Sequence, residues 1–473
     1  MLSPRADAAA LARPPIPAWM LGSLTAVTAA LVAATQSPAT AVFIVSSALL
    51  GLLVVAARVG HGPVDFFEPF WFFVILYVVG YGGKAALVVA NQEAFVVYPR
   101  YYNPTDPAAP VLVAALVGLV SLTVGYRSRL HRPASRLIPD LGDRAVSSRR
   151  LVWASIIFLG LGLLALLVTA ASAGVTLSPT SALFNVDTRR TLLAKMTGAG
   201  PVFILILVMP LFALTLFTAL LARPLRARHY LVIFATTLVT AYCMSFIGGR
   251  IYLLGFLLGG LVLWHYGHRR IKAGTQFLIF VGTGVAASAL GVILFPDAFS
   301  FSGYDLVRRL SGTFDGFELT RIAMSDVKSY FWGLTLFEDL FLTYVPRALV
   351  SAKPVIYGVV RAQEATLPGF YDAVGQTSTY PPSILAEGYL NFGWAGFVIL
   401  PFLAGVALRA LYEKGRELGG ANLAILALTV GQMLVVIRSL GAFLAQLVIY
   451  SGFAFLAFRL HIPLRRHRLL TRS

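Results

Sequence analysis

The sequence predicts an all-α membrane protein, a bundle of about twelve transmembrane helices with one large extracytoplasmic loop. Three observations predict this class. Hydrophobic residues make up 58% of the 473 residues and charged residues only 12%, which is too little polar surface for a soluble domain. The apolar residues fall in long blocks, and a helix needs about 20 such residues to cross a hydrocarbon core. Lysine and arginine collect on alternate connections between these blocks.

Twelve apolar blocks are candidates for membrane-spanning helices, with an error of one or two because three blocks are short. Arg5 and Arg13 precede the first block and no small-residue cleavage site follows it, so we expect a retained helix and no signal peptide. We expect the whole chain, residues 1–473, to form a single membrane domain. The blocks lie at 18–35, 41–57, 70–90, 109–125, 151–173, 201–222, 229–246, 251–267, 275–295, 391–411, 421–437 and 441–460.

The distribution of positive charge predicts the orientation. With both termini in the cytoplasm, inward segments hold 24 Lys and Arg against 7 Asp and Glu, whereas outward segments hold 13 of each and Lys84 lies within the third block. The inward excess follows the positive-inside rule, and the connection from Arg127 to Arg150 alone carries seven arginines. Because this topology accounts for the net charge of +18, we do not expect nucleic acid as a partner.

Three predicted outward connections are long: residues 91–107, 174–200 and 296–383. The last is too long for a bare loop. Within it, aromatic and aliphatic residues from Phe331 to Tyr344 are interleaved with Glu338 and Asp339. We expect one or two short amphipathic helices there, lying at the outer membrane surface or packed as a lid on the bundle.

Arginine is frequent on the predicted outward side, although that side has no net charge. A guanidinium offers a fixed fork of donors suited to phosphate, so a membrane-embedded substrate with a phosphate head group would explain the enrichment. Ion pairs with the outward acids are the alternative. The arginines are Arg189, Arg190, Arg250, Arg308, Arg309, Arg321, Arg347, Arg361 and Arg438.

All seven histidines fall on inward segments or at inward ends of spans. Acid–base chemistry on the outward side would therefore use Asp, Glu, Tyr or Lys, and we expect neither a metal site nor a cofactor there. Gly255 and Gly259 form a GxxxG pattern in the eighth block, which allows close approach of another helix. Cys243 is the only cysteine, which excludes an intrachain disulfide.

Three stretches resemble the bacterial oligosaccharide repeat-unit polymerases, the O-antigen polymerase (Wzy) family. They are SFIGGR at Ser245–Arg250, YVPRALVSAKP at Tyr344–Pro354 and SILAEGYLNFGWAG at Ser383–Gly396. Their order and the large outward loop between late spans are also similar to that family, and the resemblance covers roughly residues 180–440. An Arg-x10-Gly pattern described for the family occurs from Arg189 to Gly200 and from Arg347 to Gly358.

The resemblance implies a GT-C-like architecture and a glycosyl transfer at the outer face of the bacterial inner membrane. A growing glycan on undecaprenyl diphosphate would pass to the sugar end of a second lipid-linked repeat unit, and lipid diphosphate would leave. Arginines can stabilise the charge on the leaving group without a metal, and a carboxylate can orient or deprotonate the acceptor hydroxyl. The implied partners are undecaprenyl-diphosphate-linked oligosaccharides, the lipid bilayer and a chain-length regulator protein.

Specific residues follow from this hypothesis. Glu387 is the preferred carboxylate, because a charge is expensive where an apolar span begins; its alternative role is an ion pair with a neighbouring arginine. Arg250 and Arg347 complete the expected catalytic set. The expected diphosphate contacts are Arg250, Arg347, Lys353, Arg321, Arg308, Arg438 and Arg189. The candidates for sugar contacts or alternative bases are Tyr389, Asn391, Asp315, Glu318 and Asp339, of which Tyr389 and Asn391 have backbone hydrogen bonding as their alternative.

Three rival classes share some of these features. O-antigen ligases are associated with a histidine in the large outward loop, and residues 296–383 contain none. Other GT-C glycosyltransferases usually carry an acidic pair in the first outward loop, and residues 36–40 contain no acid. A flippase for lipid-linked oligosaccharides would place charges deep within spans, where Lys84 is the only clear example.

Overall fold

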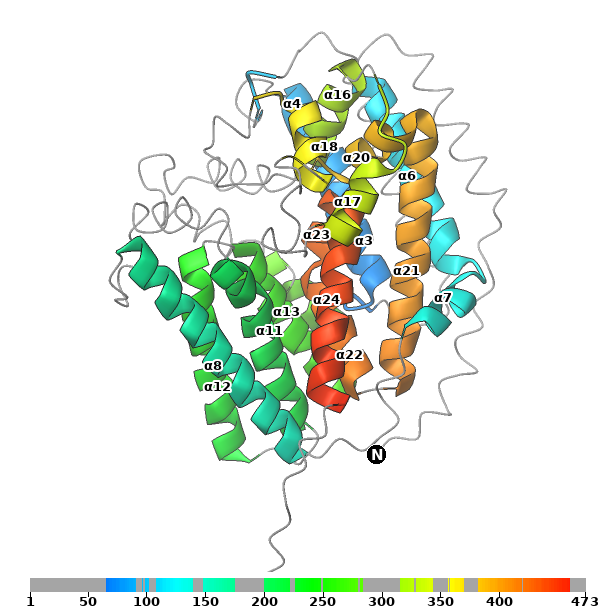
Figure 1. Ribbon diagram of the computed structural model, residues 1–473. Coiled ribbons are helices and arrows are strands. Elements are labelled where there is room, and N and C mark those ends of the chain that lie inside the picture. The colour runs from blue at the N-terminus through cyan, green and yellow to red at the C-terminus, as the bar shows by residue number, and fades with distance from the viewer. Residues whose placement is uncertain are drawn as a thin grey trace, which may run out of the picture.

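The protein is a bundle of α-helices (Figure 1). No β-strand occurs among the residues that this computed structural model describes, so the predicted all-α class is confirmed for that part of the chain. The described residues are 65–90, 96, 98–101, 108–138, 148–174, 200–221, 226–247, 250–279, 281–283, 315–326, 329–342, 356, 358–369, 382–418 and 420–459.

Four described segments are long and apolar enough to cross a membrane: Pro69–Val88, Ala108–Arg127, Arg150–Ala171 and Ile384–Leu418. Each overlaps one of the predicted blocks. The first combines α3 (Pro69–Val78), the π-helix η2 (Val79–Gly83) and the start of α4 (Lys84–Ala90), and the others contain α6 (Ala108–Arg127), α8 (Ser148–Ala173) and α21 (Gly396–Leu418). The protein therefore has the helices of a membrane protein.

Further apolar helices complete the body of the bundle. They are α11 (Gly200–Leu221), α12 (Ala227–Ile247), α13 (Arg250–Gly267), α22 (Gly420–Gly431), α23 (Met433–Arg438) and α24 (Leu440–Arg459). A short polar helix, α7 (His131–Leu137), follows α6. The predicted spans at 18–35 and 41–57 lie outside the described residues, as does nearly all of the predicted loop 174–200.

Glycines set the closest helix contacts. A Cβ on Gly255 of α13 would overlap the carbonyl oxygen of Gly431 on α22, and one on Gly259 would lie 3.0 Å from the carbonyl oxygen of Ala427. The predicted GxxxG contact is thereby confirmed, with α22 as its partner. At a second crossing, a Cβ on Gly405 of α21 would overlap the carbonyl oxygen of Leu122 on α6.

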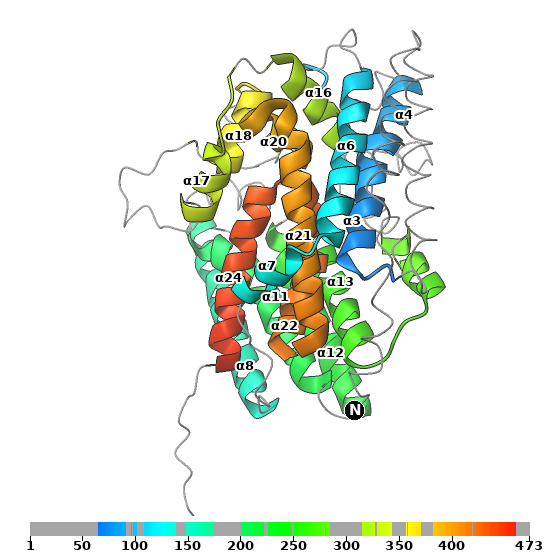
Figure 2. The ribbon, with the colours of Figure 1, turned by 90° about the vertical axis from the view of Figure 1, so that its right-hand side faces the viewer.

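Four short helices gather at one end of the bundle, the upper end in Figures 1 and 2. They are α16 (Gly316–Asp326), α17 (Leu334–Leu342), α18 (Gly358–Thr366) and α20 (Ile384–Phe392). We call this the acidic end, after the buried carboxylates described below. Three of the helices fall within residues 296–383, where the sequence predicted one or two. The amphipathic segment that the sequence indicated begins at Phe331 and contains α17; α16 is an additional helix, and its residues Phe317 to Ala323 are all buried.

The predicted span 391–411 has the wrong limits. The chain first forms α20, then a 3₁₀ turn at Gly393–Ala395, and only then the 23-residue helix α21. Gly388 and Gly396 allow α20 and α21 to touch through backbone atoms. At its other end α21 continues to Leu418, where Arg409–Glu413 and Tyr412–Arg416 contacts at i,i+4 spacing support additional turns.

The predicted span 421–437 is also divided, because α22 ends at Gly431 and α23 begins at Met433. The backbone N–H of Gln432 donates to the carbonyl oxygens of both Leu428 and Thr429, at 2.9 and 3.1 Å. Only Ser439 separates α23 from α24. This short connection brings the start of α24 next to α20, where the candidate site lies.

Candidate functional site

A pair of carboxylates forms the centre of the acidic end. Glu387 on α20 is fully buried, and Asp339 on α17 is 1% exposed. Both face Gly441 on α24: a Cβ there would lie 2.8 Å from Asp339 Oδ2 and 3.1 Å from Glu387 Oε1. Three helices from different parts of the sequence thus bring these two acids together. The sequence alone did not predict that they are neighbours.

The described partners of Glu387 differ from the alternative role that the sequence left open. Ser439 donates its hydroxyl to Glu387 Oε1 at 2.9 Å, and the N–H of Leu440 donates to Glu387 Oε2 at 2.7 Å. Among the described residues these contacts take the place of the ion pair with arginine that the sequence suggested. The backbone N–H lies at the first residue of α24, where a negative charge is favourable.

Asp339 and its neighbour Glu338 hold the start of α18. The N–H of Val359 donates to Asp339 Oδ1 at 2.9 Å, and the N–H of Gly358 donates to Glu338 Oε2 at 2.7 Å. Arg361 binds both oxygens of Glu338, at 2.9 and 2.8 Å. Gly358 has a φ of 53° and no space for a side chain, because a Cβ would overlap Asp339 Oδ1. The two acids therefore join α17 to α18.

A second group of charges lies beside α16. Lys84 Nζ is 3.6 Å from Glu318 Oε2, and these side chains are 1% and 0% exposed. Tyr98 donates its N–H to Glu318 Oε1 at 2.6 Å and its hydroxyl to Asp315 Oδ2 at 2.8 Å. Arg438 approaches Asp315 Oδ1 at 3.9 Å. Lys84 directly follows the π-helix η2, and π-helical turns are frequent at functional sites.

Neutral polar side chains fix α20 between these groups. Ser383 has a φ of 91° and caps α20 by accepting the N–H of Ala386 at 3.1 Å. Its hydroxyl also lies 3.0 Å from the Thr320 hydroxyl, and its own N–H donates to the carbonyl oxygen of Arg438 at 2.8 Å. These contacts link α16, α20 and α23, so the positions of Glu387 and Arg438 depend on one network.

Asn391 and Tyr389, predicted as sugar-binding residues, differ in their surroundings. Asn391 is fully buried: it accepts the N–H of Gly333 at 3.1 Å and donates to the Thr335 hydroxyl at 2.7 Å and to the carbonyl oxygen of Glu387 at 2.8 Å. It thus has the backbone-bonding role that the sequence left open. Tyr389 is 8% exposed and packs edge-on against Tyr330, at 5.8 Å between ring centroids.

The predicted phosphate-binding cations are described only in part. Arg321 is 5% exposed on α16, and Arg438 lies at the end of α23 beside Asp315. Arg250 begins α13, but its side chain lies outside what the structure describes. Arg189, Arg308, Arg347 and Lys353 also lie outside the described residues. Of the predicted site, the structure therefore brings together the carboxylates with Arg321 and Arg438.

Sequence reasoning missed several residues of this site. Ser439 and Gly441 carried no pattern, and Lys84 was noted only as a charge within a span. Glu338 was noted without a role, and its bidentate pair with Arg361, which anchors α18, is an example of the alternative given for the outward arginines. The acidic pair in Phe337-Glu-Asp-Leu340, placed between apolar residues, was the pattern that could have indicated two inward-facing acids.

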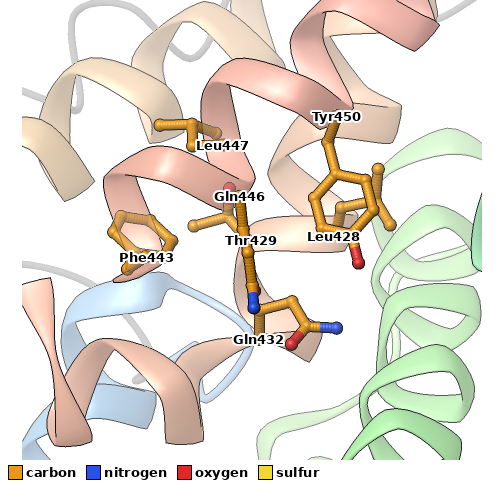
Figure 3. Close-up of a pocket in the computed structure, with 7 residues that line it drawn as sticks. All are labelled: Leu428, Thr429, Gln432, Phe443, Gln446, Leu447 and Tyr450. Atoms are coloured by element: carbon orange, nitrogen blue, oxygen red, sulfur yellow. The ribbon is translucent and has the colours of Figure 1, made fainter. Parts of the chain in front are cut away.

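A small cavity lies farther along α24, between that helix and the break after α22 (Figure 3). Its volume is about 10 Å³, close to the minimum that holds one water molecule. Gln432 and Gln446 line it, and their amide oxygens lack a hydrogen-bond partner within the described part of the chain. The cavity is too small for a sugar, so the candidate site remains the acidic end.

A second polar cluster lies at the opposite end of the α3–α4 segment. Asp65 Oδ2 accepts the Tyr266 hydroxyl at 2.7 Å and lies 3.3 Å from His265 Nε2. Burial alone would raise the pKa of Asp65, but the hydrogen bond and charge of His265, with hydrogen bonds from Tyr266 and Phe67, lower it below the ordinary value. Nearby, Glu68 accepts the Tyr126 hydroxyl at 2.8 Å. We call this the opposite cluster.

The fold and the buried charges define a helical membrane protein with a polar site at one end of the bundle. Comparison with protein-family models, with characterised proteins and with solved structures finds no match for this chain. The function is therefore inferred from the site itself together with the sequence motifs.

Proposed function

We propose that the protein is a membrane polysaccharide polymerase, which transfers a growing glycan from undecaprenyl diphosphate to a lipid-linked repeat unit. The observation that carries the proposal is the carboxylate pair of Glu387 and Asp339 beside Gly441. Glu387 belongs to the third of the polymerase-like stretches, Ser383–Gly396, so the motif and the buried acid coincide. Burying an acid in an apolar environment is energetically costly, so its presence there supports a functional role.

The proposed topology has about twelve spans in the bacterial inner membrane, with both termini in the cytoplasm. In that topology the acidic end faces outward and residues 296–383 form the large outward loop. The charge distribution of the sequence supports this orientation. It places the opposite cluster, with Asp65 and His265, on the cytoplasmic side.

In the proposed reaction the acceptor hydroxyl attacks the anomeric carbon of the donor glycan. The bond from that carbon to the lipid diphosphate breaks, and the diphosphate leaves with the bonding electron pair. The hydroxyl proton passes to Glu387. The nearby carboxylate of Asp339 favours this transfer, because two adjacent carboxylates cannot easily both be charged. Arg438, Arg321 and the predicted loop residues Arg347 and Lys353 stabilise the leaving diphosphate.

The experiment that tests this proposal measures polymer length. Glu387→Gln and Arg347→Ala are expressed in cells that lack the chromosomal copy, and surface polysaccharide is separated on a gel. Glu417→Gln is the matched control, because it makes the same acid-to-amide change at an exposed position of α21. We expect single-repeat products from the first two variants and long ladders from the control. Wild-type ladders from stably expressed Glu387→Gln and Arg347→Ala would exclude the assignment.

O-antigen ligases and other lipid-linked glycosyltransferases remain as alternatives within the same chemistry. A ligase would attach finished polymer to a different acceptor and would not lengthen it. Purified protein incubated in detergent with lipid-linked repeat units therefore separates these activities. Extension of the repeat units supports a polymerase, and no extension contradicts it.

One observation favours a second class, the flippase. Lys84 of a candidate span and Glu318 of α16 form an ion pair that is almost fully buried. Transporters commonly keep such charges inside their bundles. Activity in detergent again decides, because detergent micelles have no two sides between which transport could be measured.

A further inference from the structure

Helix α17 shows the reverse of the burial pattern of a helix on a water-exposed surface. Its polar residues Thr335, Glu338 and Asp339 are 0%, 4% and 1% exposed. Its apolar residues Leu334, Phe337 and Phe341 are 42%, 57% and 55% exposed and form one stripe at i, i+3 and i+7 spacing. Phe337 and Phe341 also pack on each other, with ring centroids 4.6 Å apart.

Hydrogen bonds hold this arrangement in place. Asp339 and Glu338 bond to the start of α18, as described above. The segment before α17 is fixed to α20, because Phe331 and Trp332 donate their N–H groups to the carbonyl oxygens of Leu390 and Asn391, both at 2.9 Å. The helix cannot rotate its phenylalanines inward without breaking these buried contacts, each of which is costly to lose.

Aromatic rings extend the apolar stripe toward a candidate span. Trp332 is 77% exposed and packs edge-on against Tyr330, which contacts Tyr389, which in turn contacts Trp394. Trp394 is 57% exposed just before α21. Beyond it, α21 exposes Val398, Ile399 and Leu403 at 46%, 38% and 49%. The stripe on α17 therefore joins the apolar face of the segment Ile384–Leu418, one of the four candidate spans.

We infer that α17 is an interfacial helix whose apolar stripe inserts into the lipid of one leaflet. The defined stripe consists of Trp332, Leu334, Phe337 and Phe341. Hydrocarbon is the occupant that matches it, because exposed aromatic and aliphatic area costs about 25 cal/mol per Å² in water. Tryptophan and tyrosine at the junction with α21 match the preference of these rings for the level of the lipid head groups.

This inference determines the depth of the carboxylate pair. Asp339 lies on the face of α17 opposite the stripe, and Asp339 and Glu387 both approach Gly441 on α24. Only the thickness of α17 separates the pair from lipid, so the pair lies at the depth of the interface. The inference concerns position and does not depend on the proposed reaction.

Spin labels measure that depth in the full-length protein. The buried Cys243 is replaced by alanine, and a nitroxide is attached to Phe337→Cys or Phe341→Cys after reconstitution into phosphatidylethanolamine–phosphatidylglycerol vesicles. Collision rates are measured with oxygen, which concentrates in lipid, and with a water-soluble nickel complex. Leu403→Cys on α21 is the lipid-facing reference, and Ser325→Cys on α16 is the exposed polar reference.

We expect the labels at 337 and 341 to match the Leu403 label, with oxygen collisions exceeding nickel collisions and the order reversed at 325. Labels at 337 and 341 that behave as the Ser325 label does would overturn the inference. Labels could instead be shielded from both reagents and become accessible when the protein is diluted to one copy per nanodisc. That result would assign the stripe to contact with a second copy and would also overturn the inference.

A second measurement avoids the cysteine substitutions. Lipids with brominated acyl chains quench tryptophan fluorescence on contact. Trp332→Phe should remove part of the quenched emission, whereas Trp71→Phe should not, since Trp71 is 4% exposed within the bundle. Equal quenched fractions in wild type and Trp332→Phe would place Trp332 away from lipid and contradict the inference.

Discussion

The acidic end and the opposite cluster both contain buried acids, but the two regions differ in how far their charged side chains are exposed. At the acidic end Lys84, Glu318, Asp339 and Glu387 are each no more than 1% exposed. In the opposite cluster the Asp65 side chain is 23% exposed, and the neighbouring Arg409 and Glu413 are 19% and 25% exposed, although Glu68 is only 6% exposed. Water can therefore reach part of the opposite cluster, whereas the four charged groups of the acidic end are closed to it. Complete burial of charge rarely increases stability, so the difference makes the acidic end the stronger candidate for a functional site.

The largest expected effect comes from breaking the buried ion pair. Lys84→Met leaves Glu318 buried without the cation 3.6 Å away, and such a loss typically costs about 3–5 kcal/mol. Arg409→Met removes partly hydrated ion pairs with Glu413 and Glu68, for which we expect about 1 kcal/mol. Thermal unfolding in detergent measures both variants.

A double variant sharpens this comparison. Lys84→Met combined with Glu318→Gln removes both charges and should recover much of the lost stability, because no buried charge then lacks its partner. Equal losses for Lys84→Met and Arg409→Met would show that burial does not distinguish the two regions.

A smaller effect is expected at the carboxylate pair. Gly441→Ala would place a methyl group 2.8 Å from Asp339 Oδ2 and 3.1 Å from Glu387 Oε1, so one acid must move. We expect a loss of about 1–3 kcal/mol, as for other overpacked sites, together with shortened polysaccharide. Gly452→Ala is the control on the same helix, since a Cβ there meets nothing within 4 Å. An unchanged melting temperature and ladder for Gly441→Ala would contradict the close pairing.

The last expected effect, also small, concerns Asp65 in the opposite cluster. Asp65→Asn loses charge-assisted hydrogen bonds with His265 and Tyr266, and we expect about 1–2 kcal/mol at pH 7. Because the pKa of Asp65 is lowered in the folded protein, its ionised form stabilises the fold above the ordinary pKa of about 3.9, and this contribution is lost as the pH falls through the folded value.

Melting temperatures of wild type and Asp65→Asn at pH 7 and at about pH 2, below the lowered pKa, measure this dependence. The two proteins should differ at pH 7 and converge on acidification. A difference that persists unchanged at the lower pH would show that Asp65 acts through packing and not through its charge.

Much of the helical framework could be predicted because it depends on local composition. The blocks at 70–90, 109–125 and 151–173 coincide with described apolar helices, and the GxxxG at Gly255 and Gly259 marks a real crossing. The limits of the spans at 391–411 and 421–437 were wrong, because the breaks at Gly393–Ala395 and at Gln432 carry little change in hydropathy. The position of such breaks depends on tertiary contacts, which cannot be predicted from a single sequence.

The candidate site was predictable only as a set of separate residues. Glu387 was named from its charge at the start of an apolar span, Asp339, Asp315 and Glu318 as alternative bases, and Arg438 as an outward arginine. The structure places all five at the acidic end. Their pairing was not predictable, because Asp339 and Glu387 are brought to Gly441 by helices distant in sequence. The roles of Arg347 and Lys353 stay predictions.

The sequence by itself determined that this chain is apolar, helical and polarised in charge, since those properties depend on which residues occur and at what spacing. Only the tertiary structure decided which charges meet, that Glu387 bonds to Ser439 and Leu440, and that α17 turns its acids inward and its phenylalanines outward. The physical reason is that the backbone hydrogen bonds of a helix are made between residues close in sequence. A buried charge must instead be paired by groups that the fold brings from distant parts of the sequence.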